Sequence, residues 1–149
     1  MGDINWKTGC WVTTIFLVQN QQVLLSWNLN LQTWIPVGGH IDPGEQPHDA
    51  IKREVAEETG LEFEFVPEHT MSDNVKNITP VYVRIDPVHH HKFHINLVYA
   101  GRVTGGSSGA QTDEGEKLRW FSREDLQKES MPESVKEAAL HVLEKVSNR

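Results

Sequence analysis

One segment of the chain, Gly39–Leu61, constrains the fold more than any other: it reads GHIDPGEQPHDAIKREVAEETGL. Proline is favoured in the first turn of a helix and glycine just after the last, so the pattern predicts a helix over Pro47–Thr59 that ends at Gly60. Ile51 and Val55 lie one helical turn apart and give the helix a narrow apolar stripe. The segment therefore predicts an amphipathic helix that packs on another element through this stripe.

The predicted helix carries three acids, Glu54, Glu57 and Glu58, at positions i, i+3 and i+4. At about 100° per residue, their side chains fall in one sector of the helix roughly 100° wide. Like charges at this spacing repel, and the helix dipole disfavours anions in the last turn. Such a cluster makes chemical sense if the carboxylates bind a hard divalent cation such as Mg²⁺. The competing interpretation is an acidic face that only contacts water.

The rest of the chain predicts several strands and two further helices. The expected strands are Cys10–Val18, Val23–Trp27, Trp34–Val37, Leu61–Phe65, Thr79–Ile85, Phe93–Val103 and Leu118–Phe121. Ser122 and Asp125 are expected to cap a short helix, and Ser130 with Glu133 to form the capping box of the last helix. No linker or repeat divides the sequence, so we expect one domain over residues 1–149, an α/β fold with a mixed sheet covered by helices.

The charge of the chain excludes some classes of partner. Fourteen Lys and Arg against 21 Asp and Glu give a formal net charge of −7. An acidic chain without a basic run is not suited to bind a nucleic-acid polymer or an anionic membrane. The longest apolar stretch is too short to span a bilayer, Asp3 stands where a signal peptide would be basic, and the lone Cys10 excludes an intrachain disulfide. We expect a cytoplasmic protein.

The spacing of residues within Gly39–Leu61 resembles the signature of Nudix hydrolases at every defined position. The match runs Gly39, five residues, Glu45, seven residues, then Arg53-Glu54-Val55-x-Glu57-Glu58-x-Gly60-Leu61. The resemblance implies an α/β/α sandwich with a central mixed sheet, in which this loop–helix–loop binds Mg²⁺ or Mn²⁺. It also implies that a metal-activated water attacks a phosphorus of a nucleoside diphosphate linked to another group.

The resemblance assigns roles to individual residues. It implies metal ligands at Glu54, Glu57, Glu58 and the carbonyl of Gly38, with Arg53, Glu54 and Glu57 forming the catalytic group. Arg53 is expected to pair with Glu45, and Gly60 is a structural position of the signature. Family members often take another acid from a loop before a late strand carrying Trp. Here Glu114 is the better match and Glu116 the second; it would bind metal or act as general base, and a solvated acidic loop is the alternative.

Contacts with the substrate are predicted less directly. Gly39, His40, Trp34, His94 and Asn96 are candidates. A packing role is the alternative for Trp34, and a strand-surface role is the alternative for His94 and Asn96. The run His89–His91, followed by His94, suggests zinc, but zinc ligands must converge in space and a lone Cys10 offers no set of thiolates. Zinc is therefore disfavoured by the sequence.

The substrate follows mainly by elimination. A MutT-like enzyme acting on a nucleoside triphosphate or similar small nucleotide is the first choice, and ADP-ribose or a nucleotide sugar is the alternative. A nucleotide-sensing domain without turnover is a second class, disfavoured because every acid of the signature is present. Isomerisation of an isoprenoid diphosphate is a third, and it would need a cysteine near the site. Many family members are dimers, so a homodimer also stays open.

Overall fold

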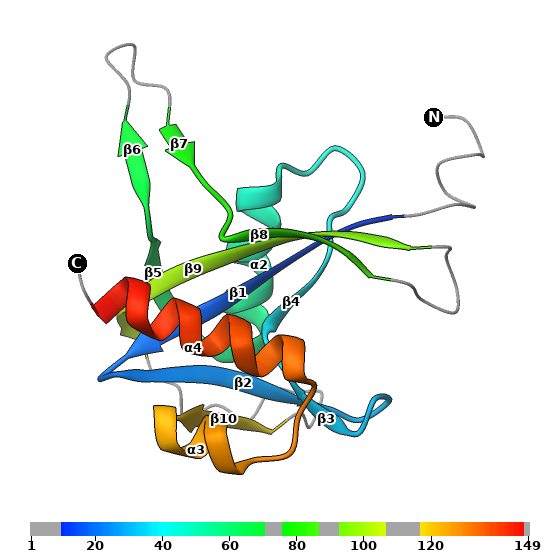
Figure 1. Ribbon diagram of the computed structural model, residues 1–149. Helices are drawn as coiled ribbons and strands as arrows, with labels where there is room; N and C mark the ends of the chain where they lie inside the picture. Colours follow the sequence, from blue (N-terminus) through cyan, green and yellow to red (C-terminus); the bar gives the residue numbers. More distant parts are fainter. Residues whose placement is uncertain (1–9, 71–75, 87–92, 107–116, 148–149) are drawn as a thin grey trace.

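An eight-stranded mixed sheet forms the centre of the molecule in the computed structural model, which describes residues 10–70, 76–86, 93–106 and 117–147 (Figure 1). Its strands are β1 (Cys10–Gln19), β2 (Gln22–Asn28), β3 (Thr33–Ile35), β4 (Val37–His40), β5 (Leu61–Phe65), β8 (Tyr82–Asp86), β9 (His94–Gly106) and β10 (Leu118–Phe121). The order along the main path is β10-β2-β1-β9-β5. β3 pairs with β2, β4 with β1 and β8 with β9.

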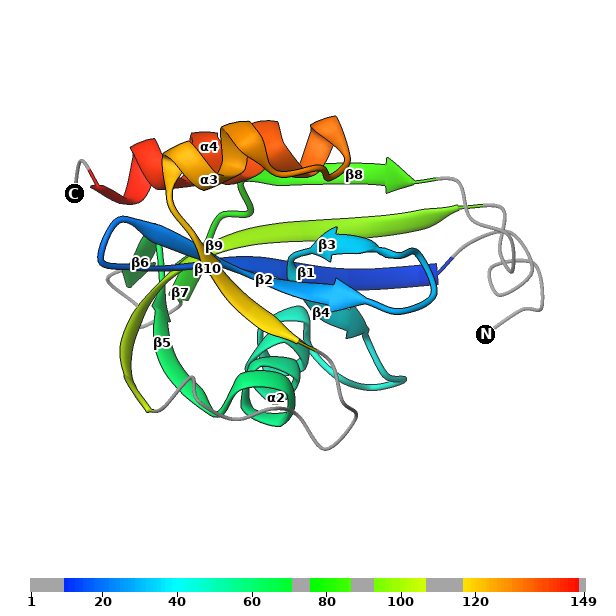
Figure 2. The ribbon, with the colours of Figure 1, turned by 90° about the horizontal axis from the view of Figure 1, so that it is seen from below.

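Helices cover both faces of this sheet. Helix α2 (Pro47–Thr59) lies on one face, and α3 (Arg123–Lys128) and α4 (Glu133–Ser147) lie on the other, as the edge-on view in Figure 2 shows. The expected α/β/α sandwich is confirmed by this arrangement. Within the described residues, none of the helices combines the length and the apolar character that crossing a bilayer requires.

The parallel pairing of β1 with β9 sets which side chains share a face. Its register places Cys10 beside His94 and Phe16 beside Ala100, whereas every other pairing in the sheet is antiparallel. Successive side chains of a strand point to opposite faces. Phe16 therefore packs in the core under α4, and Ile15 packs in the core under α2. We call these two sides of the sheet the α4 face and the α2 face.

Local sequence signals explain two of the helices. α2 begins at Pro47 and ends at Gly60, which has a left-handed backbone (φ 70°) and donates its N–H to the carbonyl of Ala56 at 3.2 Å. Both ends of this helix agree with the prediction. α3 begins with the expected capping box, in which Ser122 and Asp125 each bind the other's backbone N–H. Ile51 and Val55 are fully buried against the sheet, as the apolar stripe of α2 predicts.

Several boundaries differ from the sequence prediction. The capping box of Ser130 and Glu133 is wrong because α4 begins at Glu133, and the Pro132 carbonyl accepts its first helical bonds from the N–H groups of Val135 and Lys136. The strand expected over Trp34–Val37 is divided into β3 and β4, and β4 continues to His40 because it pairs with β1. The strand expected over Thr79–Ile85 begins later as β8, and a small ribbon of β6 (Glu68–Thr70) and β7 (Lys76–Ile78) was not predicted.

Candidate active site

The acidic flank of α2 lies against strand β4. The backbone N–H of Gly38 donates to Oε2 of Glu58 at 3.2 Å, which ties the end of α2 to this strand. The next residue, Gly39, lies so close to Glu54 that a Cβ at this position would be 2.5 Å from its Oε1 and 2.9 Å from its Cδ. A side chain there would collide with the carboxylate, so glycine is required for the close approach. The two glycines of β4 and the carboxylates of Glu54 and Glu58 thus lie side by side, and we call this surface the acidic edge.

Arg53 connects the acids to the loop before the helix. It donates to Glu45 through Nε at 2.8 Å and through Nη2 at 2.9 Å, a two-pronged pair that fixes the guanidinium plane. Nη1 donates to Glu54 at 3.0 Å and to Glu57 at 3.4 Å. Nη2 also donates to the carbonyl of His40 at 3.2 Å. Arg53 therefore positions two carboxylates of α2 relative to the loop and to β4.

Hydrogen bonds and burial shift the pKa values of three side chains in this cluster. The bonds from Arg53 and from the Asp42 N–H lower the pKa of Glu45 to about 2, so Glu45 is ionised at neutral pH. The same pairing with Glu45 raises the pKa of Arg53. Burial raises the pKa of Glu54, which is opposed by its bond with Arg53. One guanidinium faces Glu45, Glu54 and Glu57, so negative charge is in excess.

Such a donor set fits a hard divalent cation. Carboxylate oxygens are what Mg²⁺ and Mn²⁺ prefer. Arg53 binds one oxygen of Glu54 and one of Glu57, and the second oxygen of each carboxylate takes no part in these contacts. The Glu57 side chain is 61% exposed and the Glu54 side chain 15% exposed. A cation would thus meet one shielded and one open carboxylate on the same flank of α2.

All the candidate substrate contacts except Gly39 lie on the α4 face instead. Asn96 is buried on β9, and its Oδ1 accepts a hydrogen bond from Thr14 Oγ1 at 3.1 Å. The rings of His40 and His94 meet edge to face with centroids 5.1 Å apart. β4 separates the two groups, because Gly39 faces α2 whereas the His40 side chain points to the α4 face.

Trp34 is partly a core residue. Its ring meets Trp27 and Phe121 edge to face, with centroids 5.3 and 5.1 Å apart, and packs against the core under α4. Packing is the alternative that the sequence already offered for this residue. Trp34 thus belongs to a cluster of aromatic side chains with Trp27 and Phe121 on the α4 face.

Three polar residues near Asn96 were missed by the sequence analysis. On β8, Arg84 is paired with Asn96 and Asp86 with His94. Arg84 Nη2 donates to Asp86 Oδ1 at 2.8 Å and to Ser134 Oγ, at the start of α4, at 3.3 Å. The signal was the alternation of Arg84 and Asp86 with apolar Val83 and Ile85, which places the two charges on one face of a strand.

Some predicted residues cannot be placed. Glu114 and Glu116, the candidate additional acids, lie outside the described residues, as does the run His89–His91. Their predicted roles stay predictions. β10, the late strand that carries Trp120, is described and pairs with β2.

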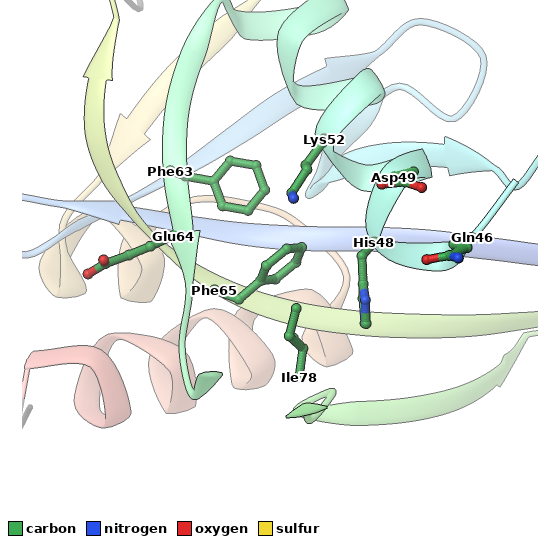
Figure 3. A pocket seen from close by; sticks show the side chains of 8 residues that line it. All are labelled: Gln46, His48, Asp49, Lys52, Phe63, Glu64, Phe65 and Ile78. Atoms are coloured by element: carbon green, nitrogen blue, oxygen red, sulfur yellow. The ribbon is translucent and has the colours of Figure 1, made fainter. Parts of the chain in front are cut away.

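A pocket of about 460 Å³ lies on the other flank of α2, between that helix and β5. Its lining includes Gln46, His48, Asp49, Lys52, Phe63, Glu64, Phe65 and Ile78. Figure 3 shows that Lys52 and His48 from α2 face Phe63 and Phe65 from β5. The acids of the signature are not among the lining residues, so this pocket and the acidic edge are separate features of α2.

Comparison with known proteins matches most of the chain to one family. The family model described as NUDIX domain matches residues 11–143. A putative 8-oxo-dGTP diphosphatase of Bacillus subtilis is 31% identical over 108 residues, which cover 72% of this chain and 62% of that protein. The human 8-oxo-dGDP phosphatase NUDT18 is 31% identical over 127 residues, 80% of this chain and 34% of that protein. The chain thus spans less than two thirds of these curated relatives.

The fold is also found among solved structures. The crystal structure of a NUDIX-family hydrolase from Clostridium perfringens has a TM-score of 0.78 and is 27% identical. The similarity covers 90% of this chain and 95% of that one. The sheet and helices described above therefore form an arrangement that this relative shares almost throughout.

Proposed function

The chain belongs to the family of proteins with a NUDIX domain, and on that basis we propose that it is a metal-dependent pyrophosphohydrolase. It cleaves a diphosphate linkage in a nucleotide by attack of water on phosphorus. The observation that carries the proposal is the edge formed by Gly38, Gly39 and the acids of α2. There the Gly39 backbone approaches Glu54, and the Gly38 N–H donates to Glu58.

In the proposed site, the cation and the protein side chains have different roles. When bound by Glu54, Glu57 and Glu58, Mg²⁺ or Mn²⁺ neutralises phosphate charge and lowers the pKa of a water molecule. Arg53 holds two of these carboxylates in place and is itself held by Glu45. Because Gly39 has no side chain, its backbone would not block a diphosphate from approaching the carboxylates. Gly38, through its carbonyl, stays a proposed further ligand.

We propose a purine nucleoside triphosphate as the substrate, with the oxidised nucleotide 8-oxo-dGTP as the first member to test. The names of the Bacillus subtilis and human relatives support this choice, since both specify oxidised guanine nucleotides. A base is read by paired donors and acceptors, and the α4 face offers these at Asn96, Arg84 and Asp86. His40, His94 and Trp34 would border the same surface.

ADP-ribose and nucleotide sugars are the alternative substrates. Solved structures of a UDP-X diphosphatase and of an ADP-ribose pyrophosphatase from Streptococcus suis share the fold, but at 17% and 18% identity. At that level the likeness supports the fold and leaves the substrate open. Cytoplasmic location and a homodimer likewise remain predictions from the sequence.

The test is phosphorus NMR of product formation across a panel of nucleotides. The panel holds the nucleoside triphosphates, their oxidised forms, ADP-ribose and nucleotide sugars, each with Mg²⁺, with Mn²⁺ and with chelator. We expect metal-dependent cleavage, fastest for an oxidised purine triphosphate. Cleavage of ADP-ribose alone would overturn the substrate assignment. If nothing is cleaved while a nucleotide still raises the melting temperature, the protein senses nucleotides and the proposed enzymatic function is wrong.

A further inference from the structure

Three side chains of the kinds that can bind transition metals converge at one end of the sheet. Cys10 begins β1 and His94 begins β9, and the parallel register places them side by side at the same end (Figure 1). His40 ends β4 and is paired with Val12, two residues after Cys10 and therefore on the same face. The three residues are far apart in the sequence and meet only because β1 lies between β9 and β4.

The distances between the three side chains suit a common ligand. One ligand atom from each of Cys10, His40 and His94 lies within 4.8 Å of the other two. In a tetrahedral zinc site with bonds of about 2.0–2.3 Å, ligand atoms are roughly 3.3–3.6 Å apart. Binding of one cation by all three would require side-chain rotations that close this difference. The two imidazole rings already stand nearly perpendicular, with an interplanar angle of 87°.

We propose that Cys10, His40 and His94 form a binding site for a thiophilic divalent cation, with Zn²⁺ as the ion that fits best. One thiolate and two imidazoles match the ligands that zinc prefers, and three protein ligands leave a fourth position for water. Magnesium favours oxygen ligands and is not expected to bind there. Burial raises the pKa of the Cys10 thiol, and a cation that bound the sulfur would displace its proton.

This site is distinct from the proposed catalytic cation site. The acids of α2 lie on the α2 face, whereas the Cys10, His40 and His94 side chains lie on the α4 face. β4 runs between the two groups, and the His40 carbonyl accepts the 3.2 Å bond from Arg53. The two sites therefore differ in location and in donor chemistry, and binding at one can be measured without turnover at the other.

The sequence disfavoured zinc because a lone cysteine offers no thiolate set and the convergence of the histidines was unknown. The structure supplies that convergence through strand pairing over 84 positions of sequence, from Cys10 to His94. It does so without the run His89–His91, which lies outside the described residues and forms no part of the proposed site.

A cobalt titration tests this site directly. Metal-free, reduced protein is titrated with Co²⁺ while excess Mg²⁺ occupies carboxylate sites, and the thiolate-to-cobalt charge-transfer absorption is followed. Because Cys10 is the one cysteine of the chain, any such band reports this sulfur. Cys10→Ala and His94→Asn are compared with the control His141→Asn, which changes an exposed histidine of α4. A variant with His89–His91 replaced by Asn tests adventitious binding by that run.

We expect one equivalent of Co²⁺ to produce the band, and one equivalent of Zn²⁺ to remove it. Cys10→Ala should abolish the band. His94→Asn should weaken binding roughly tenfold or more, since even changes around metal ligands cost about 10–100-fold. Zn²⁺ should raise the melting temperature of the wild type and of His141→Asn but not of Cys10→Ala, whose own melting curve shows whether it folds.

The absence of the band in the wild type would overturn the proposal. So would equal Zn²⁺ stabilisation of wild type and folded Cys10→Ala, or loss of the band in the His89–His91 variant together with a full band in His94→Asn. None of these results depends on hydrolysis, so the proposal can fail while the proposed enzymatic function stands.

Discussion

Replacing Glu57 by glutamine tests whether its carboxylate serves the proposed reaction or stabilises the fold. Glu57 lies in the last turn of α2, its side chain is 61% exposed, and its contact with Arg53 is 3.4 Å long. Arg53 is bound more closely by Glu45 and by Glu54. The change therefore removes one oxygen of the proposed metal site and one negative charge, and it leaves the main ion pairs of Arg53 in place.

The change should affect the stability of the fold far less than it affects the rate of hydrolysis. An exposed ion pair contributes about 0–1 kcal/mol, whereas removing an anion from the end of a helix gains about 0.3–1 kcal/mol. These contributions nearly cancel, so we expect the free energy of unfolding to change by less than about 0.5 kcal/mol. Loss of a ligand to the catalytic cation should raise the activation barrier by about 3–4 kcal/mol, which is roughly a 10²–10³-fold loss of turnover.

The assay combines urea unfolding with the rate of nucleotide hydrolysis at saturating Mg²⁺. The matched control is Glu137→Gln, which removes one exposed charge from α4 and should leave both quantities unchanged. If Glu57→Gln retains turnover within about threefold of the wild type, Glu57 is not a ligand. If it unfolds far more easily than Glu137→Gln, its role is structural.

Three other perturbations follow from the same contacts. The folded-state pKa of Glu45, about 2, lies below its ordinary value of 4.5, so its pairing with Arg53 stabilises the fold above pH 4.5 and is lost as the pH falls toward 2. Glu45→Gln should therefore unfold more easily than wild type at pH 7, with the gap closing below pH 4.5; a gap independent of pH in urea titrations would contradict this. Gly39→Ala should displace the flexible end of Glu54 and lower turnover while changing the melting temperature little, and unaltered turnover would refute the close approach. Ser122→Ala removes the cap of α3 and should cost about 1 kcal/mol of unfolding free energy in urea, whereas a loss near zero would show that the cap is dispensable.

Local signals in the sequence were sufficient for α2 and α3. Pro47 and Gly60 mark the ends of α2 because their backbone preferences act within a single residue, and Ser122 caps α3 through bonds to residues three positions away. The pairing of Arg53 with Glu45 was expected from the resemblance and is present at 2.8 Å. Features governed by nearby residues were thus predictable.

Features that depend on distant pairing were not. One local signal also failed: the capping box assigned to Ser130 is wrong because α4 begins later than that box requires, at Glu133. Arg84 was not recognised as part of the site, since the pairing with Asn96 on β9 and the contact with Ser134 bring together distant parts of the chain. The meeting of Cys10 with His94 requires the parallel register of β1 and β9, which side-chain periodicity alone does not specify.

The proposed function requires that the acidic flank of α2 beside β4 binds the divalent cation used for diphosphate cleavage. Mn²⁺ binding measured by electron paramagnetic resonance tests it most directly, using wild type, the double variant Glu54→Gln/Glu57→Gln and the control Glu137→Gln. We predict saturable Mn²⁺ binding to the wild type and to Glu137→Gln, displaced by Mg²⁺, and its loss in the double variant. Equal Mn²⁺ affinity in all three folded proteins would contradict the claim.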